Sequence, residues 1–326
     1  MPIAIINPSS GLELKPSGDG WLRDEKGGGY PVVNGIPRVC EPINYTENFG
    51  KQWNAFRATQ MDRPEHGLKL SERRFFQATG WTPEEMAGQD VLEVGSGAGR
   101  FSRVVLQRTK ANLWSIDYST AVEANLANNG EISGDRFHLF QASVYEMPFP
   151  ASSFDKVFCM GVLQHTPDFE ASVRALIRKA KPGGEIVVDF YPIKGWWTKI
   201  HAKYLLRPIT RRMPHDRLLR LIEKNADRLI AASLFLDKVG LHVLTRFLPV
   251  CDIRGTLPRG LSEKELREWV VLDTFDQYSP EYDNPQRVKA VARMFERAGA
   301  TVTYADIMTL DDGFTSAVVR GTKNPQ

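Results

Sequence analysis

Between residues 88 and 190, short apolar runs alternate with segments whose apolar residues recur at helical spacing. The runs have the length of buried strands, because a strand covered on both faces has a continuous apolar sequence. Strands alternating with helices are typical of a parallel sheet with helices on both faces. We therefore expect an α/β fold with strands at about 90–94, 112–116, 136–140, 155–160 and 185–190.

The pattern divides the chain into four expected segments. Residues 1–44 are rich in Gly, Pro and Ser and predict a small β module, and residues 45–190 hold the core with its N-terminal helices. Residues 191–284 form a helical insertion over the core. Residues 285–326 complete the sheet with a helix and an antiparallel strand pair joined by the turn Asp311-Asp312-Gly313.

Residues 45–87 predict three helices. Phe49, Trp53 and Phe56 fall on one face of the first. Ser71 is the expected N-cap of the second. Thr82 is the expected N-cap of the third, with a proline at the first helical position and acids in the first turn.

Charge is distributed unevenly along the insertion. Residues 191–260 hold 14 Lys and Arg against 5 Asp and Glu, a net charge of +9, so the rest of the chain carries −6. Apolar stripes such as RLIAASLFL predict two or three amphipathic helices, and the commonest role of such stripes is core packing. Positive charge over the expected substrate entrance favours an anionic substrate. The next helix is expected to start at Ser262, in a capping box with Glu265.

A glycine-rich turn, GSGAGR at residues 95–100, follows the first core strand and precedes a helix. This arrangement lets a nucleoside-bearing ligand lie on bare backbone beside a helix N-terminus. Arg100 stands where a dinucleotide-binding turn has its third glycine, which argues against NAD or FAD. Asp117, 22 residues after Gly95, ends the next strand, where a carboxylate accepts hydrogen bonds from ribose hydroxyls. With Glu93 inside the strand, the pattern indicates a nucleoside ligand without a pyrophosphate.

Five ordered segments over residues 88–191 together resemble class I S-adenosylmethionine (SAM)-dependent methyltransferases: EVGSGAGR, IDYS, EMPFPASSFDKVF, GVLQHTPD and KPGGEIVV. The resemblance implies a Rossmann-like seven-stranded sheet, mostly parallel with the last strand antiparallel, carrying a helical lid insertion and a small N-terminal β module. It also implies SAM as the cofactor and S-adenosylhomocysteine as the product.

The resemblance implies a cofactor site as well. The glycines approach the methionine part of SAM, Asp117 holds the ribose and Tyr118 lies against the adenine. Many relatives carry Asp where this chain has Ser143, so the adenine contacts here would fall mainly to backbone at 142–144. The expected cofactor-binding residues are Gln52, Trp53, Glu93, Gly95, Ser96, Gly97, Gly99, Arg100, Asp117, Tyr118, Ser119, Ala142, Ser143, Val144, Met160 and Gly161.

Three residues are catalytic candidates. His165, in the loop after the fourth core strand, borders the expected reaction site, and its neutral imidazole would take a proton from an acceptor hydroxyl. The alternative is that it only shapes the pocket. Asp276 and Tyr278 would bind acceptor hydroxyls or help position SAM, or they belong to a loop ordered by its own turns. We expect methyl transfer to an oxygen or nitrogen of a small-molecule, sugar-like or natural-product acceptor.

Two other functions compete with this interpretation. A non-catalytic SAM-binding scaffold or sensor would carry the same cofactor residues. A nucleotide-dependent oxidoreductase or epimerase is disfavoured by Arg100 and by the lack of an evident Tyr-x-x-x-Lys pair.

Metal binding is not expected. The three cysteines are scattered without a C-x-x-C pair, so neither a disulfide framework nor a zinc site is indicated. YPVVNGIPRV resembles the last hairpin of zinc-ribbon modules fused to some methyltransferases. Asn7 and Ser10 stand where that family has metal-binding cysteines, and neither side chain replaces a thiolate on zinc.

Location and partners follow from composition. The chain shows neither a secretory signal nor an apolar stretch of about 20 residues, so we expect a cytoplasmic protein. Expected partners are a small-molecule, sugar-nucleotide or lipid-linked glycan acceptor, with peripheral membrane contact as a weaker alternative. Nucleic acid is not favoured, since no known nucleic-acid-binding module accompanies the basic segment. The oligomeric state is not predicted.

Overall fold

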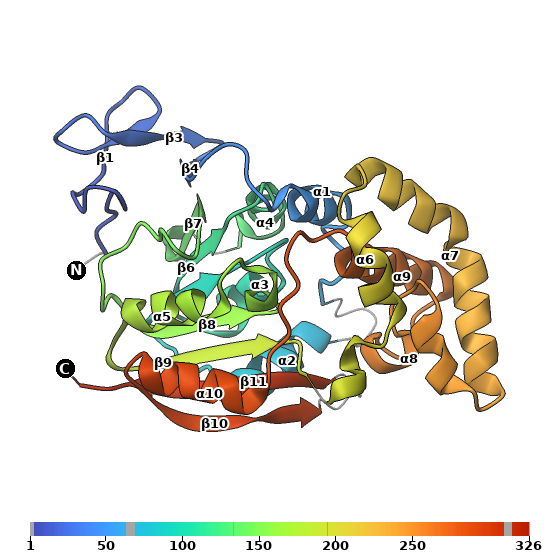
Figure 1. The fold of residues 1–326 in the computed structure, drawn as a ribbon. Coiled ribbons are helices and arrows are strands. Elements are labelled where there is room, and N and C mark those ends of the chain that lie inside the picture. The colour runs from blue at the N-terminus through green and yellow to red at the C-terminus, as the bar shows by residue number, and fades with distance from the viewer. Residues whose placement is uncertain (1–2, 63–68, 133, 194, 310–314, 326) are drawn as a thin grey trace.

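The computed structural model describes residues 3–62, 69–132, 134–193, 195–309 and 315–325. Within these residues, eleven strands form one sheet in the order β1-β2-β3-β4-β7-β6-β5-β8-β9-β11-β10 (Figure 1). The strands are β1 (Lys15–Pro16), β2 (Trp21–Arg23), β3 (Gly29–Val33), β4 (Ile36–Val39), β5 (Asp90–Val94), β6 (Asn112–Asp117), β7 (Phe137–Ala142), β8 (Phe154–Met160), β9 (Ala180–Phe190), β10 (Ala300–Thr309) and β11 (Thr315–Lys323).

The seven strands from β7 to β10 form the predicted core sheet. Strands β5 to β9 pair in parallel, β11 runs antiparallel to β9, and β10 runs antiparallel to β11. The α/β class, the five parallel strands and the antiparallel last strand are thus confirmed. The predicted Asp311-Asp312-Gly313 turn lies outside the described residues.

Helices cover both faces of this sheet (Figure 1). The α-helices are α1 (Glu47–Ala55), α2 (Leu70–Thr79), α3 (Arg100–Arg108), α4 (Val122–Asn129), α5 (Phe169–Lys179), α6 (Ala202–Thr210), α7 (His215–Lys238), α8 (Ile253–Thr256), α9 (Glu263–Tyr278) and α10 (Val288–Arg297). Short 3₁₀ helices are η2 (Gly134–Arg136), η3 (Leu163–His165), η4 (Trp196–Lys199) and η5 (His242–Phe247).

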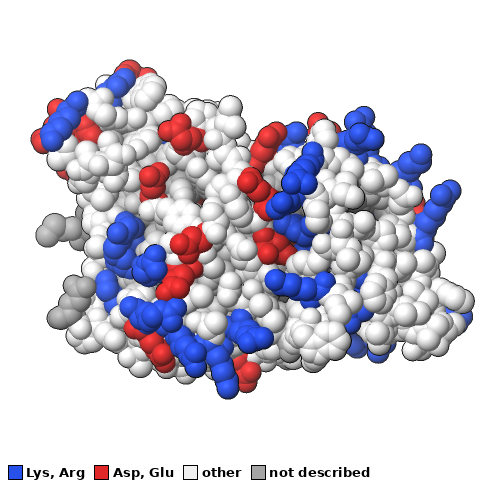
Figure 2. Space-filling view, viewed as in Figure 1, with Lys and Arg blue, Asp and Glu red and all other residues white. Residues whose placement is uncertain are grey.

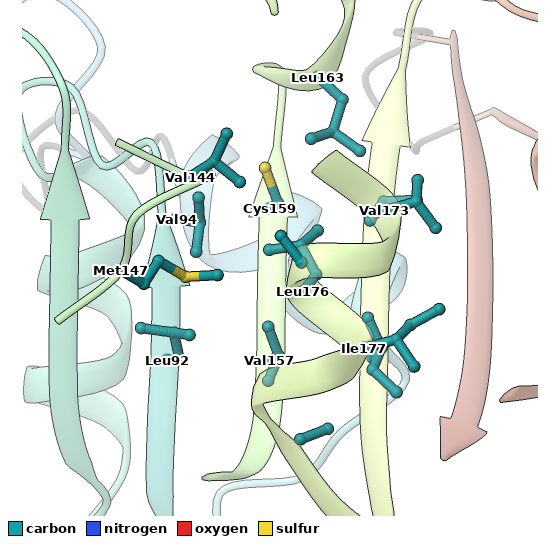
Figure 3. Close-up of a cluster of buried hydrophobic side chains, with 14 of the residues drawn as sticks. Leu92, Val94, Val144, Met147, Val157, Cys159, Leu163, Val173, Leu176 and Ile177 are labelled. Carbon is teal, nitrogen blue, oxygen red and sulfur yellow. The ribbon is translucent and has the colours of Figure 1, made fainter. Parts of the chain in front are cut away.

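Neighbouring strand residues point to opposite faces of the sheet and so feed two separate hydrophobic clusters. On one face, Val91 and Phe158 pack with side chains of α2 and α3. On the other, Leu92 and Val157 pack with α5 and α10, and Figure 3 shows the side chains of β5, β8 and α5 meeting there. This two-sided burial holds the carboxyl ends of β5 and β8 in place.

The N-terminal strands extend the sheet, because β4 pairs in parallel with β7. Asp24 occupies the centre of their turns. Its carboxylate accepts hydrogen bonds from the Asn7 amide (2.7 Å) and the Ser10 hydroxyl (2.9 Å), the two side chains at the positions compared with zinc ligands. No cluster of three or more metal-ligating side chains occurs among the described residues.

Two helix starts differ from the prediction. Ser71 lies inside α2, whose first amides are instead bonded by the Asp62 carboxylate at 2.8 Å. Thr82 does form a reciprocal cap with Glu85, but the segment is only a turn that closes at Gly88, with φ +74°. The spacing of apolar residues predicts neither the capping of α2 by Asp62 nor the end of the Thr82 segment at Gly88.

The insertion between β9 and α10 contains α6 to α9 with η4 and η5, and lies at the opposite end of the molecule from the N-terminal strands (Figure 1). Its predicted capping box at Ser262 and Glu265 is present. Within the described part of the chain, no helix combines the length and apolar character needed to cross a bilayer.

Candidate functional site

A cavity of about 540 Å³ lies at the carboxyl ends of the central strands. Strand order reverses on the two sides of β5, and in open α/β sheets ligands bind at such a switch point. The volume lies in the range of small-molecule sites. Its walls come from the ends of β5, β6, β8 and β9, from α1, and from η4, α6 and α9 of the insertion.

The glycine turn presents bare backbone to this cavity. Gly95 and Gly97 line it, with φ values of +79° and +53° that favour glycine. A Cβ on Gly95 would lie 2.3 Å from a Val162 methyl, and one on Gly97 would lie 3.2 Å from Trp53 Nε1. Side chains at these positions would therefore fill the cradle or collide with its walls.

Asp117 is fixed above this turn. Its Oδ2 accepts from the Gly97 amide (2.8 Å), and its Oδ1 accepts from the amide (2.8 Å) and hydroxyl (2.6 Å) of Ser119. Burial raises the pKa of Asp117. A carboxylate oxygen accepts two hydrogen bonds, so Oδ2 keeps one acceptor position for a ligand hydroxyl.

Five cavity residues carry buried polar atoms without a hydrogen-bond partner among the described residues: Gln52, Ser96, His165, Arg246 and Gln277. The side-chain amide of Gln52 lacks a partner at both of its polar atoms, and Ser96 lacks one at its hydroxyl. Buried polar groups in native proteins are almost always paired. These groups therefore fit a polar ligand, such as the amino-acid end of SAM, lying on the glycine turn.

The structure brings most of the expected cofactor residues together. The cavity lining includes Gln52, Trp53, Gly95, Ser96, Gly97, Arg100, Asp117, Tyr118, Ala142, Val144, Met160 and Gly161. Arg100 also holds the surrounding helices, because its guanidinium donates to Gln60 Oε1 (2.7 Å) and Ser71 Oγ (3.1 Å). Burial lowers its pKa to about 10, so it stays charged at neutral pH.

Four expected cofactor residues, Glu93, Gly99, Ser119 and Ser143, lie behind the lining, where they support the residues that form it. Ser119 orients Asp117, as above. A Cβ on Gly99 would meet Asn125 and Asn129 rather than a ligand. Ser143 accepts a hydrogen bond from the Tyr145 amide at 3.2 Å and so shapes its own turn.

Glu93 is the fourth of these residues. Its Oε2 accepts from the hydroxyls of Ser102 (2.5 Å) and Ser115 (2.9 Å), beneath the glycine turn. Complete burial raises the pKa of Glu93 to about 7, although both hydroxyls lower it. Glu93 thus supports the turn from below. At neutral pH its neutral and charged forms are present in comparable amounts.

His165 lines the cavity from η3. Its Nδ1 lies 3.1 Å from the carbonyl oxygen of Tyr282, which can only accept, so the proton lies on Nδ1. Its Nε2 is buried without a hydrogen-bond partner among the described residues, 3.9 Å from Asp276 Oδ2. Burial lowers the pKa of His165, so the imidazole is neutral at pH 7 and Nε2 carries a free lone pair.

Helix α9 turns one face to the cavity. Trp269, Leu272, Asp273, Asp276 and Gln277 line it, at the spacing of residues on one side of a helix. Burial, together with the Asp276 charge, raises the pKa of Asp273 to about 8, so it is mostly protonated at neutral pH.

The catalytic expectation for Tyr278 is corrected by this geometry. Tyr278 shares the opposite face of α9 with Val271 and Phe275 and packs against Leu218 and Ile222 of α7, outside the cavity lining. Two residues apart on a helix, Asp276 and Tyr278 cannot face the same site.

Several cavity residues were missed by the sequence analysis. The Tyr191 hydroxyl donates to Asp276 Oδ2 at 2.9 Å, and Arg74 Nη2 pairs with Asp189 Oδ2 at 2.6 Å. Asp189 also accepts from the Gly161 amide at the end of β8. The acid that interrupts the apolar run IVVDF is a detectable signal for Asp189, whereas Arg74 has none in its own helix.

Charges in the cavity lining nearly balance, with a small positive excess because Asp273 is mostly protonated at neutral pH. Five acids line it together with five bases: Asp117, Asp189, Asp252, Asp273 and Asp276, with Arg57, Arg74, Arg100, Lys203 and Arg246. The positive excess of the insertion therefore lies mainly outside the cavity rather than in its walls.

Comparison with known proteins relates this chain to methyltransferases. Residues 92–188 match a family model described as a methyltransferase domain. The chain is 31% identical over 172 residues to a ubiquinone biosynthesis O-methyltransferase of Pseudomonas entomophila (strain L48), covering 49% of this chain and 72% of the relative. It is 33% identical over 125 residues to a ubiquinone/menaquinone biosynthesis C-methyltransferase of Vibrio campbellii, covering 36% of this chain and 48% of the relative.

Among solved structures, the chain is similar to the magnesium protoporphyrin IX methyltransferase of Synechocystis PCC 6803 with bound S-adenosylhomocysteine. The identity is 12%, the match covers 86% of this chain and 97% of the other, and the TM-score is 0.48. The glycine cradle, the fixed Asp117 and the match to the Pseudomonas enzyme together establish the family. The chain belongs to the class I SAM-dependent methyltransferases.

Proposed function

We propose that this methyltransferase acts on a hydroxyl of a small, partly apolar acceptor, with His165 as the general base. The observation that carries the proposal is the orientation of His165, whose Nδ1 is engaged by the Tyr282 carbonyl while Nε2 is unpartnered at the cavity wall. An alcohol must lose its proton when it is methylated, and a neutral imidazole with a free nitrogen accepts it. The relatives include O- and C-methyltransferases, so the acceptor atom is a proposal for this chain alone.

The cofactor supplies an electrophilic methyl group on a sulfonium, already a good leaving centre. The protein's task is therefore mainly positioning. Gly95 and Gly97 would take the methionine part, Asp117 the ribose hydroxyls, and Tyr118 the adenine. His165 Nε2 would hold the acceptor proton, and the nearby Asp276 carboxylate stabilises the imidazolium that forms.

The acceptor's other polar groups would meet α9. Asp273 is mostly protonated at neutral pH and so donates a hydrogen bond, whereas Asp276 accepts one. Because the lining charges nearly balance, the proposed acceptor bears no strong net charge where it enters the cavity. We propose a cytoplasmic location, which the three unpaired cysteines support.

Labelled methyl transfer tests the function. Protein and tritiated-methyl SAM are incubated with hydroxylated aromatic probes, catechol and a prenylated catechol, and the products are analysed by mass spectrometry. Wild type is expected to form the methyl ether. His165→Ala should lower the rate about 10²-fold or more without changing S-adenosylhomocysteine affinity.

The pH profile sharpens the assignment of His165. Since burial lowers the pKa of His165 from its ordinary value, the fall in the wild-type rate caused by protonation of this imidazole should appear only below about pH 6.5. An unchanged rate in His165→Ala would remove it as the base. Methylation at carbon or nitrogen alone would remove the hydroxyl as the acceptor.

A further inference from the structure

Exposed apolar side chains gather on the insertion. Of the 17 large hydrophobic residues exposed among the described residues, 13 lie between Trp196 and Phe247. A soluble surface normally carries such residues singly. Their concentration on one segment therefore requires an explanation. These 13 residues, called the apolar patch below, are Trp196, Trp197, Ile200, Leu205, Ile209, Leu221, Leu234, Phe235, Val239, Leu241, Val243, Leu244 and Phe247.

Helix α6 is inverted relative to an ordinary surface helix. Leu205 and Ile209, one turn apart, are 67% and 65% exposed, whereas Lys203 and Arg207 are buried. Lys203 Nζ pairs with Asp283 at 2.9 Å, and Arg207 donates to the Pro280 carbonyl at 2.8 Å. The polar face of α6 is thus held inside and its apolar face is turned outward.

The same inversion recurs beyond α6. Ser233 is buried while the adjacent Leu234 and Phe235 are exposed, and Thr245 is buried while Leu244 and Phe247 are exposed. Helix η5 is joined to η4 by a 2.7 Å hydrogen bond from Arg246 to the Trp197 carbonyl. The outward-facing apolar side chains thus come from three successive parts of the insertion.

The apolar patch reaches the cavity. Trp197 belongs to both, being 45% exposed and also part of the cavity lining, where it is joined by His201, Tyr204 and Arg246 from the same segments. An acceptor entering on this side would pass from the patch directly into the site.

The charged residues around the apolar patch indicate which kind of partner could cover it. Residues 191–260 carry a net +9, and on the face shown in Figure 2 the uncharged surface over α6 and α7 is bordered by Lys and Arg. Lys199, Arg211 and Arg212 are exposed and form no ion pair within the described residues. Two copies meeting through this face would bring exposed cations such as Lys199, Arg211 and Arg212 of one copy against those of the other, which disfavours a symmetric dimer.

We infer that the apolar patch docks this protein onto an anionic lipid surface, with the cavity mouth facing the membrane. Apolar side chains enter the interface while surrounding cations meet anionic headgroups, the combination that peripheral membrane binding requires. The inference goes beyond the proposed function, and lipid docking requires no methyl transfer.

Vesicle cosedimentation tests the docking directly, without SAM or acceptor. Wild type is expected to bind phosphatidylcholine vesicles containing about one-third phosphatidylglycerol, and to bind pure phosphatidylcholine more weakly. Leu205→Gln with Ile209→Gln keeps good helix formers in α6 and should lower the partition coefficient about tenfold or more. The matched control is Ile43→Gln, which removes an apolar side chain that is 90% exposed outside the insertion and should change nothing.

The experiment distinguishes membrane docking from dimerisation and from unfolding of the variants. Circular dichroism checks that all variants remain folded. Absence of vesicle binding by wild type, or equal binding by wild type and the double variant, would overturn the inference. A dimer in light scattering that the double variant dissociates would assign the patch to a second copy instead. Because the transfer assay is separate, failure of docking and failure of the proposed function are distinguishable.

Discussion

Helices α5 and α6 are both amphipathic, but they turn opposite faces toward the protein interior. Helix α5 buries Val173 and Leu176 against the sheet and exposes Arg174 and Arg178, as a surface helix usually does. Helix α6 buries Lys203 and Arg207 and exposes its apolar face. The comparison teaches that amphipathic spacing fixes two faces of a helix but not which of them meets the protein interior.

The largest expected difference is in the free energy of unfolding when a phenylalanine side chain is removed from the core sheet or from the apolar patch. Phe158 of β8 is 1% exposed and packs with Phe75 and Trp81, so Phe158→Ala should lower the free energy of unfolding by about 3–5 kcal/mol. Phe235→Ala, in the apolar patch, should change it by less than about 0.5 kcal/mol. Urea unfolding measures both, and equal costs would abolish the contrast.

The inward cations of α6 provide the next test. Lys203→Met removes one partner of a buried ion pair and strands the Asp283 carboxylate, so the free energy of unfolding should fall by about 3 kcal/mol. Adding Asp283→Asn should recover part of this loss. A double variant as unstable as the single one would show that packing, rather than the charge pair, holds α6 in its orientation.

Unlike Asp283, which is paired with Lys203, the buried Glu93 carboxyl has no cationic partner in any ion pair described by the structure. Its folded-state pKa of about 7 lies above the ordinary 4.5, so the folded protein binds the proton more tightly than the unfolded chain. The free energy of unfolding should therefore decrease as pH rises between these values, by up to about 3 kcal/mol. Glu93→Gln should remove this part of the pH dependence in urea unfolding at about pH 5 and pH 8. An unchanged slope would mean that Glu93 is charged throughout.

The sequence predicts the core well because its elements are local. Each parallel strand is a continuous apolar run, and the glycine turn is contiguous, so the cradle at Gly95 and Gly97 follows from spacing alone. The strands at 90–94 and 112–116 agree with β5 and β6 to within one residue.

What the sequence could not provide depends on contacts between distant segments. Three features depend on such contacts: the Asp62 cap on α2, the Arg74–Asp189 ion pair and the orientation of α6. In each case the contacting residues share no local sequence pattern. Tyr278 was misplaced for another reason. The sequence analysis paired it with Asp276 because the two residues are close in sequence, whereas the helix places them on different faces.

Isothermal titration with S-adenosylhomocysteine tests the central claim, that the cavity above the glycine turn holds the cofactor. We predict one binding site per chain, and an affinity that falls about tenfold or more in Asp117→Ala, since the carboxylate fixed by Gly97 and Ser119 would receive the ribose. Ser10→Ala, in the N-terminal turns, serves as the matched control and should bind like wild type. Equal affinity in Asp117→Ala and wild type, or no binding to a folded wild type, would contradict the account.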